Sequence, residues 1–311
     1  MALYILKRIL LFIPTLLGIT LITFILMQSL PGDAALGMAG ERANPETIAR
    51  IRAEFGADRP LPIQYFGYLK LLAAGELGRS YYTNRNVSED LLQKFPNTVK
   101  LALAAMICAS VFGIGLGVLA ASKRGTNWDR LITLLSVGGI SVPVFWLGLA
   151  LMLLFAFYLR WLPPSGMGNG SPLYLILPAA TLGTFSLSYI VRMTRSTMLE
   201  TLSQPYIAAA RAKGLSEGEV VFKHALKNSL IPVVTLIGLD LGSYLNGAVL
   251  TETIFGWDGL GRYALDGILK RDYPVIMGVV LFGAMIFVIM NLLVDISYHF
   301  LDPRVRVKEK Q

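Results

Sequence analysis

Charged residues are scarce in this chain. Only 15% of its 311 residues are Asp, Glu, Lys or Arg, against roughly 25% in an average soluble domain. A soluble protein of this length has a large surface to solvate, and so few charged side chains cannot do it. Hydrophobic residues make up 54% of the chain, and the mean hydropathy is +0.59. The composition therefore predicts an integral membrane protein.

Cysteine and histidine are nearly absent. The single cysteine, Cys108, excludes a disulfide within the chain and a cysteine metal site. The two histidines, His224 and His299, form no HExxH zinc motif, and no GxxxxGK[ST] phosphate loop occurs. The net charge of +8 does not indicate nucleic-acid binding, because the basic residues lie between apolar runs and not on one patch.

Six apolar runs are long enough to cross a bilayer, which takes about 20 residues of helix. They are residues 9–30, 101–122, 131–159, 172–191, 228–251 and 273–294. We interpret the third run as one helix kinked at Pro143. The first run is longer than the apolar region of a signal peptide, so we interpret it as an uncleaved span. The predicted fold class is an all-α membrane protein with about six transmembrane helices.

The basic residues indicate the orientation. Fifteen lie in the segments that are cytoplasmic if the N-terminus is inside: Lys7, Arg8, Lys123, Arg124, Arg130, Arg192, Arg195, Arg211, Lys213, Lys223, Lys227, Arg304, Arg306, Lys308 and Lys310. Five lie in the short outer segments: Lys100, Arg160, Arg262, Lys270 and Arg271. Residues 31–97 hold the rest, but a loop of that length translocates largely regardless of its charge. Both termini are therefore predicted to be cytoplasmic.

The spans divide the chain into three predicted regions. Residues 1–96 comprise the first span and a polar outer domain, 97–300 the membrane core, and 301–311 a cytoplasmic tail. The core contains a long basic inner loop at 192–227 and a glycine-rich outer loop at 252–272.

The inner loop contains residues that typically begin and end helices. Ser203 is a candidate N-cap with Pro205 in the first turn of a short helix. Gly214 suits a position after the helix that needs a left-handed backbone. Ser216 and Glu219 form a possible capping box for a second helix, on which we place His224. Further along, Pro232 is expected to mark the entry to the fifth span.

The short helix has an unusual face. Tyr206, Ala209, Ala210 and Lys213 recur at helical spacing and are predicted to lie on one side. The small alanines would allow a partner protein to approach closely, while Arg211 and Lys213 would orient it. The alternative is a helix that lies on lipid headgroups, but its apolar face is weak for stable insertion.

At this point the sequence resembles the permeases of binding-protein-dependent ABC importers, in their dipeptide/oligopeptide branch. The matching positions of the loop motif are Ala209, Ala210, Gly214 and Leu226, while Ala208, His224 and Lys227 depart from the general pattern in the way this branch does. Other similar segments are LPGD at 30–33, RMTRS at 192–196, ETIF…GLGR…RDYP at 252–274 and DPRVR at 302–306. One departure is Asp258, where the branch usually has proline.

The resemblance implies a type I importer permease fold in a bacterial or archaeal plasma (inner) membrane. It implies that the inner loop holds a coupling helix, which docks on a separate ATPase subunit. The implied partners are a second, homologous permease, two ABC ATPases carrying ATP and Mg, and an extracytoplasmic substrate-binding protein. No cofactor is expected on this chain, and membrane lipid surrounds it. The implied cargo is a dipeptide or oligopeptide, with nickel complexes or glutathione as alternatives.

Polar residues inside the fifth run are candidates for the translocation path. An ionised Asp240 near mid-membrane costs about 2.5–3.5 kcal/mol on insertion scales, so a cavity or a partner is expected beside it. Ser243, Tyr244 and Asn246 follow it on the outer half. The alternative is a hydrogen bond between helices within the permease pair. A secondary transporter would need ion-coupling residues in broken helices and usually a repeat of spans, and neither is evident.

Overall fold

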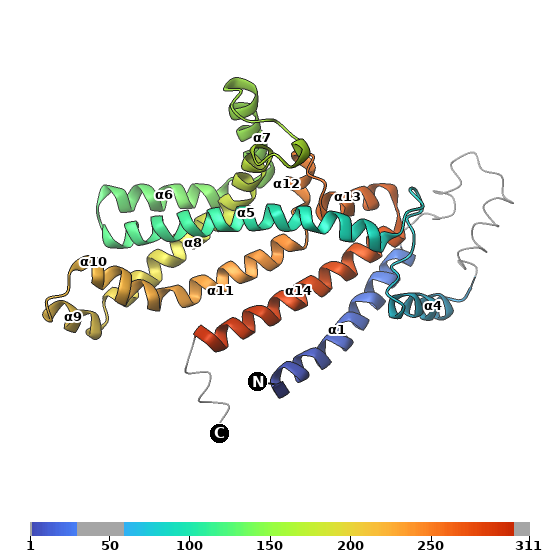
Figure 1. Ribbon diagram of the computed structural model, residues 1–311, viewed down its shortest axis with the longest axis horizontal. Helices are drawn as coiled ribbons and strands as arrows, with labels where there is room; N and C mark the ends of the chain where they lie inside the picture. Colours follow the sequence, from blue (N-terminus) through green and yellow to red (C-terminus); the bar gives the residue numbers. More distant parts are fainter. Residues whose placement is uncertain (1, 30–58, 302–311) are drawn as a thin grey trace.

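The computed structural model describes residues 2–29 and 59–301, and every regular element in this part of the chain is a helix (Figure 1). Expectations for residues 30–58 and for the tail at 302–311 lie outside the described residues. The helices are α1 (Ala2–Ser29), α4 (Leu61–Ala73), α5 (Val87–Ser122), α6 (Asn127–Ser141), α7 (Val144–Leu151), α8 (Leu173–Leu202), α9 (Pro205–Ala212), α10 (Glu217–Glu219), α11 (Leu226–Leu245), α12 (Val249–Ile254), α13 (Leu260–Lys270) and α14 (Tyr273–Leu301). Two π-helical segments, η1 (Met152–Tyr158) and η3 (Val220–Ala225), and a short 3₁₀ turn, η2 (Gly168–Gly170), complete the set.

The lengths of these helices confirm an all-α membrane fold. Four are long and apolar enough to cross a bilayer: α5, α8, the continuous helix 217–245 and α14. The α6–α7 pair, continued by η1, counts as a fifth crossing if taken as one bent span. α1 has 28 residues and covers the first predicted span, but its described apolar part, Phe12–Leu26, is shorter than a full crossing.

The third predicted span is broken, and the prediction of one kinked helix was wrong. α6 ends at Ser141, α7 begins at Val144, and the two helices are bent by 106°. Val142 is extended, with φ −82° and ψ 125°. A proline disfavours the α conformation in the residue before it, so Pro143 ends α6 and then starts α7.

Among the described helices, α5 and α8 have the most extensive contact. The sequence Gly113–Gly117 is a GxxxG pattern on α5. A Cβ at Gly113 would lie 2.7 Å from Ile190 Cγ2, and one at Gly117 would lie 2.6 Å from Thr194 Cβ. The two glycines therefore bring the backbones close, as small residues do between helices in membranes.

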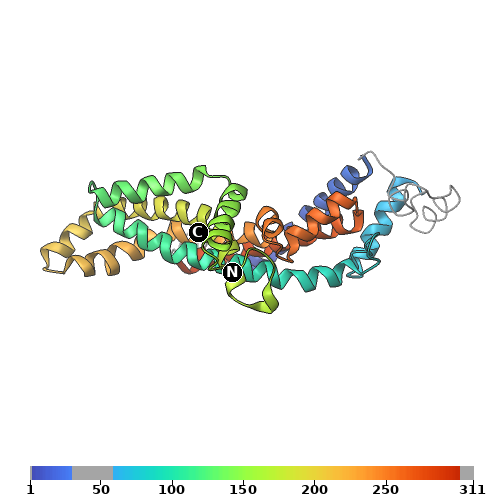
Figure 2. The ribbon, with the colours of Figure 1, turned by 90° about the horizontal axis from the view of Figure 1, so that it is seen from above.

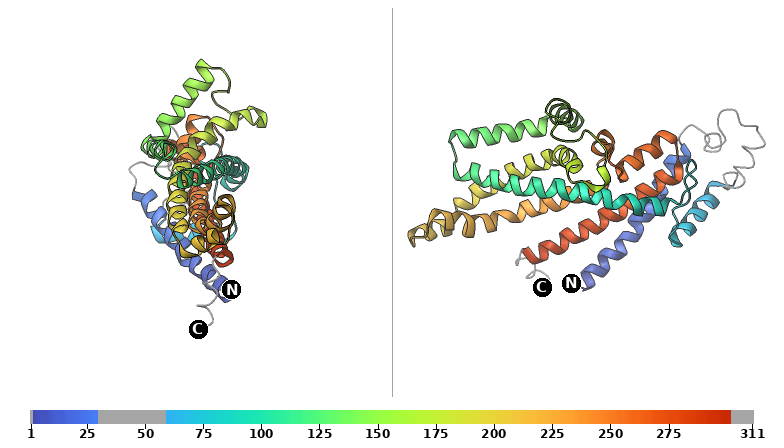
Figure 3. Two further views of the ribbon diagram at one scale, coloured as in Figure 1. Left: turned by 90° about the vertical axis from the view of Figure 1, so that its left-hand side faces the viewer. Right: turned by 45° about the horizontal axis from the view of Figure 1, so that its top comes forward.

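The helices form an elongated bundle in which sequence neighbours alternate direction. α6, α8, α11, α14 and α1 contact one another in that order, and α5 lies across α8, α11 and α14 (Figures 1 and 3). The loop helix α9 projects from one end of the long axis, while α4 and α13 lie at the other end (Figure 2). The start of α1 and the end of α14 face the α9 end, in keeping with cytoplasmic termini.

Candidate coupling loop and polar clusters

The start of α9 differs from the prediction in one residue. Ser203 does not cap this helix. It ends α8, and its hydroxyl donates to the Glu200 carbonyl oxygen at 2.7 Å. The N-cap is Gln204, which is extended, and Pro205 occupies the first turn as predicted. α8 continues past its apolar stretch and ends at Leu202.

The end of α9 confirms the left-handed glycine. Gly214 has φ +84°. Its N–H donates to the Arg211 carbonyl oxygen at 2.9 Å, and the Leu215 N–H donates to the Ala210 carbonyl oxygen at 3.4 Å. These two bonds are the Schellman pattern, in which a glycine reverses the chain after a helix. Gly214 therefore sets the direction in which the chain leaves α9.

The predicted outward face of α9 is only partly correct. Tyr206 is 44% exposed, and Ala209 and Lys213 are exposed with it. Ala210 is 8% exposed and belongs to a hydrophobic cluster with Ile207, which is fully buried. The reason is that the chain after Gly214 folds back beneath α9, so the side of Ile207 and Ala210 packs on η3 and on the ends of α5 and α8. Of the four residues of the predicted face, Tyr206, Ala209 and Lys213 are therefore the exposed ones.

The capping box after Gly214 is confirmed. The Glu219 N–H donates to Ser216 Oγ at 3.3 Å, and the Ser216 hydroxyl donates to the Glu219 carboxylate at 3.2 Å. Arg211 forms a two-pronged ion pair with Glu217, with distances of 2.7 and 3.2 Å. Arg211 therefore braces the loop internally, and its interaction with Glu217 raises the pKa of its guanidinium.

From Glu217 to Leu245 the helix is unbroken, through α10, η3 and α11. The prediction that Pro232 marks the entry to the fifth span was wrong, because Pro232 lies inside α11. His224 is half-buried and lies in η3, which is part of the second loop helix on which it was predicted to lie. A π-helical turn within an α-helix is uncommon and recurs at functional sites. The second half of the inner loop and the fifth span thus form one continuous helix.

A polar cluster joins α8 to α11 within the membrane. The Ser186 hydroxyl donates to Asp240 Oδ2 at 2.5 Å and lies 2.6 Å from the Tyr244 hydroxyl, which donates to the Leu182 carbonyl oxygen at 2.8 Å. Ser186 is fully buried, while Asp240 and Tyr244 are half-buried. Asp240 therefore has a hydrogen-bond donor inside its own chain. Ser186 was missed by the sequence analysis, because Thr181, Thr184 and Ser188 lie in the same apolar run and nothing in the sequence distinguishes Ser186 from them.

The other two predicted path residues do not join this cluster. Ser243 is exposed, and Asn246 donates to the Gly242 carbonyl oxygen within its own helix at 3.0 Å. Ser243 is thus on the exposed side of the described part of the chain. The Asn246 side chain forms its hydrogen bond locally, near the outer end of α11.

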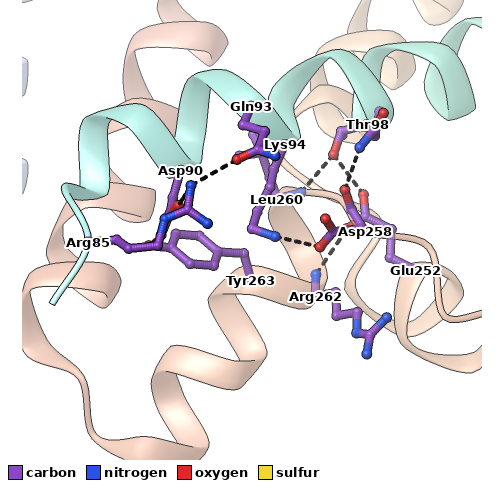
Figure 4. A network of polar contacts seen from close by, with 11 residues as sticks. Arg85, Asp90, Gln93, Lys94, Thr98, Glu252, Asp258, Leu260, Arg262 and Tyr263 are labelled. Atoms are coloured by element: carbon purple, nitrogen blue, oxygen red, sulfur yellow. Dashed lines mark hydrogen bonds and ion pairs between the residues drawn. The ribbon is translucent and has the colours of Figure 1, made fainter. Parts of the chain in front are cut away.

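A second polar network lies at the outer end, between α5 and the glycine-rich loop (Figure 4). Glu252 is fully buried, and its carboxylate accepts hydrogen bonds from the Thr98 hydroxyl at 2.9 Å and the Arg262 N–H at 3.0 Å. The Leu260 N–H donates to Thr98 Oγ1 at 2.8 Å. Burial raises the pKa of Glu252, and the hydrogen bonds oppose this shift in part. These bonds fix the start of α13 against α5.

Asp258, the departure from the family pattern, belongs to this network. Its carboxylate pairs with Lys94 at 2.5 Å, and its carbonyl oxygen accepts from the Asn97 side chain at 2.8 Å. Tyr263 lies beside them, and its hydroxyl donates to Asp90 Oδ2 at 3.2 Å (Figure 4). A proline at this position would restrict the backbone of the loop. Asp258 instead holds the loop through its ion pair to Lys94 on α5.

Taken together, the crossing helices, the capped helix at the inner end and the anchored outer loop define a polytopic membrane permease. The chain matches the model of the binding-protein-dependent transport system inner membrane component over residues 113–307, and the N-terminal model of the same system over residues 1–102. It belongs to this family. The protein is accordingly a permease subunit of an ABC importer in the inner membrane, a transporter and not an enzyme. The family works with a substrate-binding protein and an ATPase.

Relatives of known assignment cover almost the whole chain. The di/tripeptide transport system permease protein DppB of Pseudomonas aeruginosa is 44% identical over 97% of this chain and 98% of its own length. The dipeptide transport system permease protein DppB of Escherichia coli K12 is 43% identical, covering 98% and 99%. The glutathione transport system permease protein GsiC of Salmonella typhimurium is 42% identical, also covering 98% and 99%.

Solved structures support the fold. Inward-facing conformations of the MetNI methionine ABC transporter superimpose with TM-scores of 0.54 and 0.56 at 16% identity, covering 68% of this chain and 96% of that one. At this identity the likeness concerns the fold alone.

Proposed function

We propose that this chain is the permease through which an ABC importer takes up short peptides, with α9 as the helix that docks on the ATPase. The observation that carries the proposal is the unbroken helix from Glu217 to Leu245. It begins directly after the exposed α9 surface and contains Asp240, so a displacement of the loop is transmitted along one rigid element to the membrane polar cluster.

The peptide assignment rests on the relatives. Two of them are named for dipeptide or di/tripeptide transport and one for glutathione, and their identities to this chain differ by at most 2%. Glutathione is itself a tripeptide, so all three names describe short peptides. A peptide carries an ammonium group, a carboxylate and varied side chains, and Asp240 with Tyr244 offers an acidic and an aromatic surface to such a molecule.

The proposed assembly contains a second permease, two ATPase subunits that hold ATP and Mg, and an outer binding protein. In this assembly, Tyr206, Ala209 and Lys213 form the surface that contacts the ATPase. Gly214 and the Arg211–Glu217 ion pair maintain the conformation of the loop that carries this surface. ATP binding would draw the two ATPases together and move α9. Because a ligand shifts a conformational equilibrium only by binding its two states unequally, the docked ATPase must contact α9 differently in the two states.

Reconstitution tests the proposal. The complete assembly, placed in liposomes with its binding protein outside and ATP inside, should accumulate a labelled di- or tripeptide. The permease alone should not. Uptake of peptide by this polypeptide purified free of other subunits would refute the ATPase-coupled mechanism, and a complete assembly that is inactive toward peptides but active toward a nickel complex would refute the cargo.

A further inference from the structure

An apolar groove lies at the inner end of the molecule, where the ends of α5 and α8 meet the start of the helix at 217–245 (Figure 1). Its volume is about 870 Å³. Leu199 and Leu202 line it from α8, and Phe222 and Leu226 line it from the coupling-loop side. Phe222 is 63% exposed, so this apolar wall is open in the part of the chain that the structure describes.

The groove extends into the membrane. On α5 its lining begins at Ile114, eight residues before the helix ends at Ser122, and this distance is about 12 Å along the axis. Leu116 and Leu119, in the same stretch, are 37% and 39% exposed, as side chains that contact hydrocarbon are. A soluble subunit such as the ATPase can reach the mouth of the groove but not this depth.

Positive charges lie at the mouth of the groove. Lys123 and Arg124 follow the last residue of α5, border the groove and are exposed. Among the residues described, no carboxylate forms an ion pair with either of them. Glu217 also borders the groove, but Arg211 already binds its carboxylate with distances of 2.7 and 3.2 Å. The mouth therefore attracts an anion.

A tryptophan indicates the level of these charges relative to the bilayer. Trp128 is 60% exposed in the first turn of α6. Tryptophan is enriched at the membrane–water interface, where its ring lies at the level of the lipid headgroups. Lys123 and Arg124 precede Trp128 by five and four residues, so their long side chains can reach the phosphates of the inner leaflet.

We propose that this groove binds an anionic phospholipid of the inner leaflet. Its phosphate lies at Lys123 and Arg124, and an acyl chain lies along Ile114 and Leu119. One such molecule supplies both the negative charge and the apolar chain that the groove requires. A helix of a second permease would have to supply carboxylates for two cations as well as an apolar surface.

The site adds a lipid to the contacts of the coupling loop and does not depend on the identity of the cargo. Val221 and Phe222 of η3 form part of its wall, and the Arg211–Glu217 pair lies at its mouth. A bound lipid therefore touches both α5 and the start of the helix that contains Asp240.

Lipid retention tests the charge recognition. The complete assembly, extracted from vesicles of phosphatidylethanolamine and phosphatidylglycerol, should retain phosphatidylglycerol in native mass spectra. The double variant Lys123→Gln/Arg124→Gln should retain about tenfold less or lower still, because each basic residue near the membrane surface strengthens binding to anionic lipid. Arg130→Gln is the control, since Arg130 is exposed on the same side but does not border the groove. Parental retention by the double variant, or an equal loss in the control, would overturn the proposal.

Filling the groove tests the place of the acyl chain. Gly115 borders the groove, and a Cβ there would meet no atom within 4 Å, so Gly115→Leu should insert normally and retain less phosphatidylglycerol. Gly138 on α6 has equal space and does not border the groove, so Gly138→Leu should retain the parental amount. Equal retention by both variants would show that no acyl chain lies in the groove.

Photocrosslinking separates lipid from protein occupants. A photoreactive phenylalanine in place of Leu119 should link to phosphatidylglycerol in excess of its share of the vesicle. The same group in place of Leu134, which is 69% exposed on α6, should link to the two lipids in their bulk ratio. Links from position 119 to the second permease or to the ATPase, without enrichment of phosphatidylglycerol, would overturn the proposal.

Discussion

The side-chain amide of Asn228 donates one hydrogen bond to the Tyr206 hydroxyl and another to the His224 carbonyl oxygen, each 3.0 Å long. One residue in the first turn of α11 thus holds both the loop helix and the π-helical segment. A neutral hydrogen bond of this kind contributes about 0.5–1.5 kcal/mol. That is too little to unfold the bundle, but enough to alter how α9 moves with α11.

We expect Tyr206→Phe and Asn228→Leu to assemble normally and to lower the ratio of peptide imported to ATP hydrolysed. Tyr158→Phe is the control, because Tyr158 lies in η1, outside the coupling loop, and is 68% exposed. A double-mutant cycle on the ratio measures the coupling of the pair. Independent effects of the two changes would show that the contact does not transmit motion.

Gly214→Val should disturb the coupling loop through backbone strain alone. Gly214 has φ +84°, and a Cβ there would meet no atom within 4 Å. A left-handed residue with a side chain costs roughly 1–2 kcal/mol, and a β-branched one most. Gly218 is in the same loop, has equal space and a helical backbone, so Gly218→Val is the control. Pull-down of the ATPase should fail for the first variant only, and equal retention by both would contradict the role given to Gly214.

Ala209→Trp and Ala210→Trp should fail for different reasons. Ala209 is exposed, so a large ring there blocks the docking surface while the loop stays folded. Ala210 packs against Ile207 in the loop interior, where an inserted ring costs about 1–3 kcal/mol or more. Limited proteolysis of the detergent-purified assembly should therefore cut the loop faster in Ala210→Trp and at the parental rate in Ala209→Trp. Fast cleavage of both would place Ala209 in the interior as well.

Asp240→Asn should fold and assemble but transport less. The amide oxygen of asparagine still accepts from Ser186, so the α8–α11 contact is kept while the negative charge is removed. Uptake should fall several-fold with unchanged expression and ATPase binding. Ser186→Ala keeps the charge and removes its donor, which separates the two contributions. Parental uptake by Asp240→Asn would mean that Asp240 serves only the helix contact.

The buried Glu252 should make stability depend on pH. Its pKa is raised above 4.5 by burial in the folded protein, so the folded state holds the proton more tightly than the unfolded state. The resulting stability is fully present below pH 4.5 and is lost as the pH rises through the folded pKa. The melting temperature of the parental protein minus that of Glu252→Gln should therefore fall as the pH rises from 4.5. A difference that is constant or rises with pH would show that the hydrogen bonds from Thr98 and Arg262 outweigh the burial.

The sequence by itself determined the membrane class, the positions of four of the six predicted crossings, the left-handed Gly214 and the capping box of Ser216 with Glu219. These features depend on apolar run length and on backbone chemistry within a few residues, and both are local. The length of the apolar run 131–159 could not reveal the break at Pro143, because hydrophobicity alone does not distinguish one long helix from two helices bent by 106°.

Only the tertiary structure decided which residues meet. Ser186 and Asp240 are 54 residues apart, and Thr98 and Glu252 are 154 apart, so neither pair leaves a pattern in the sequence. The inward side of α9 was decided in the same way. Helical spacing groups Tyr206, Ala209 and Ala210 correctly along the axis, but the packing of η3 beneath the helix is what buries Ala210 and exposes Ala209. Which side of a helix is buried depends on the elements that pack against it, and these are known only from the folded chain.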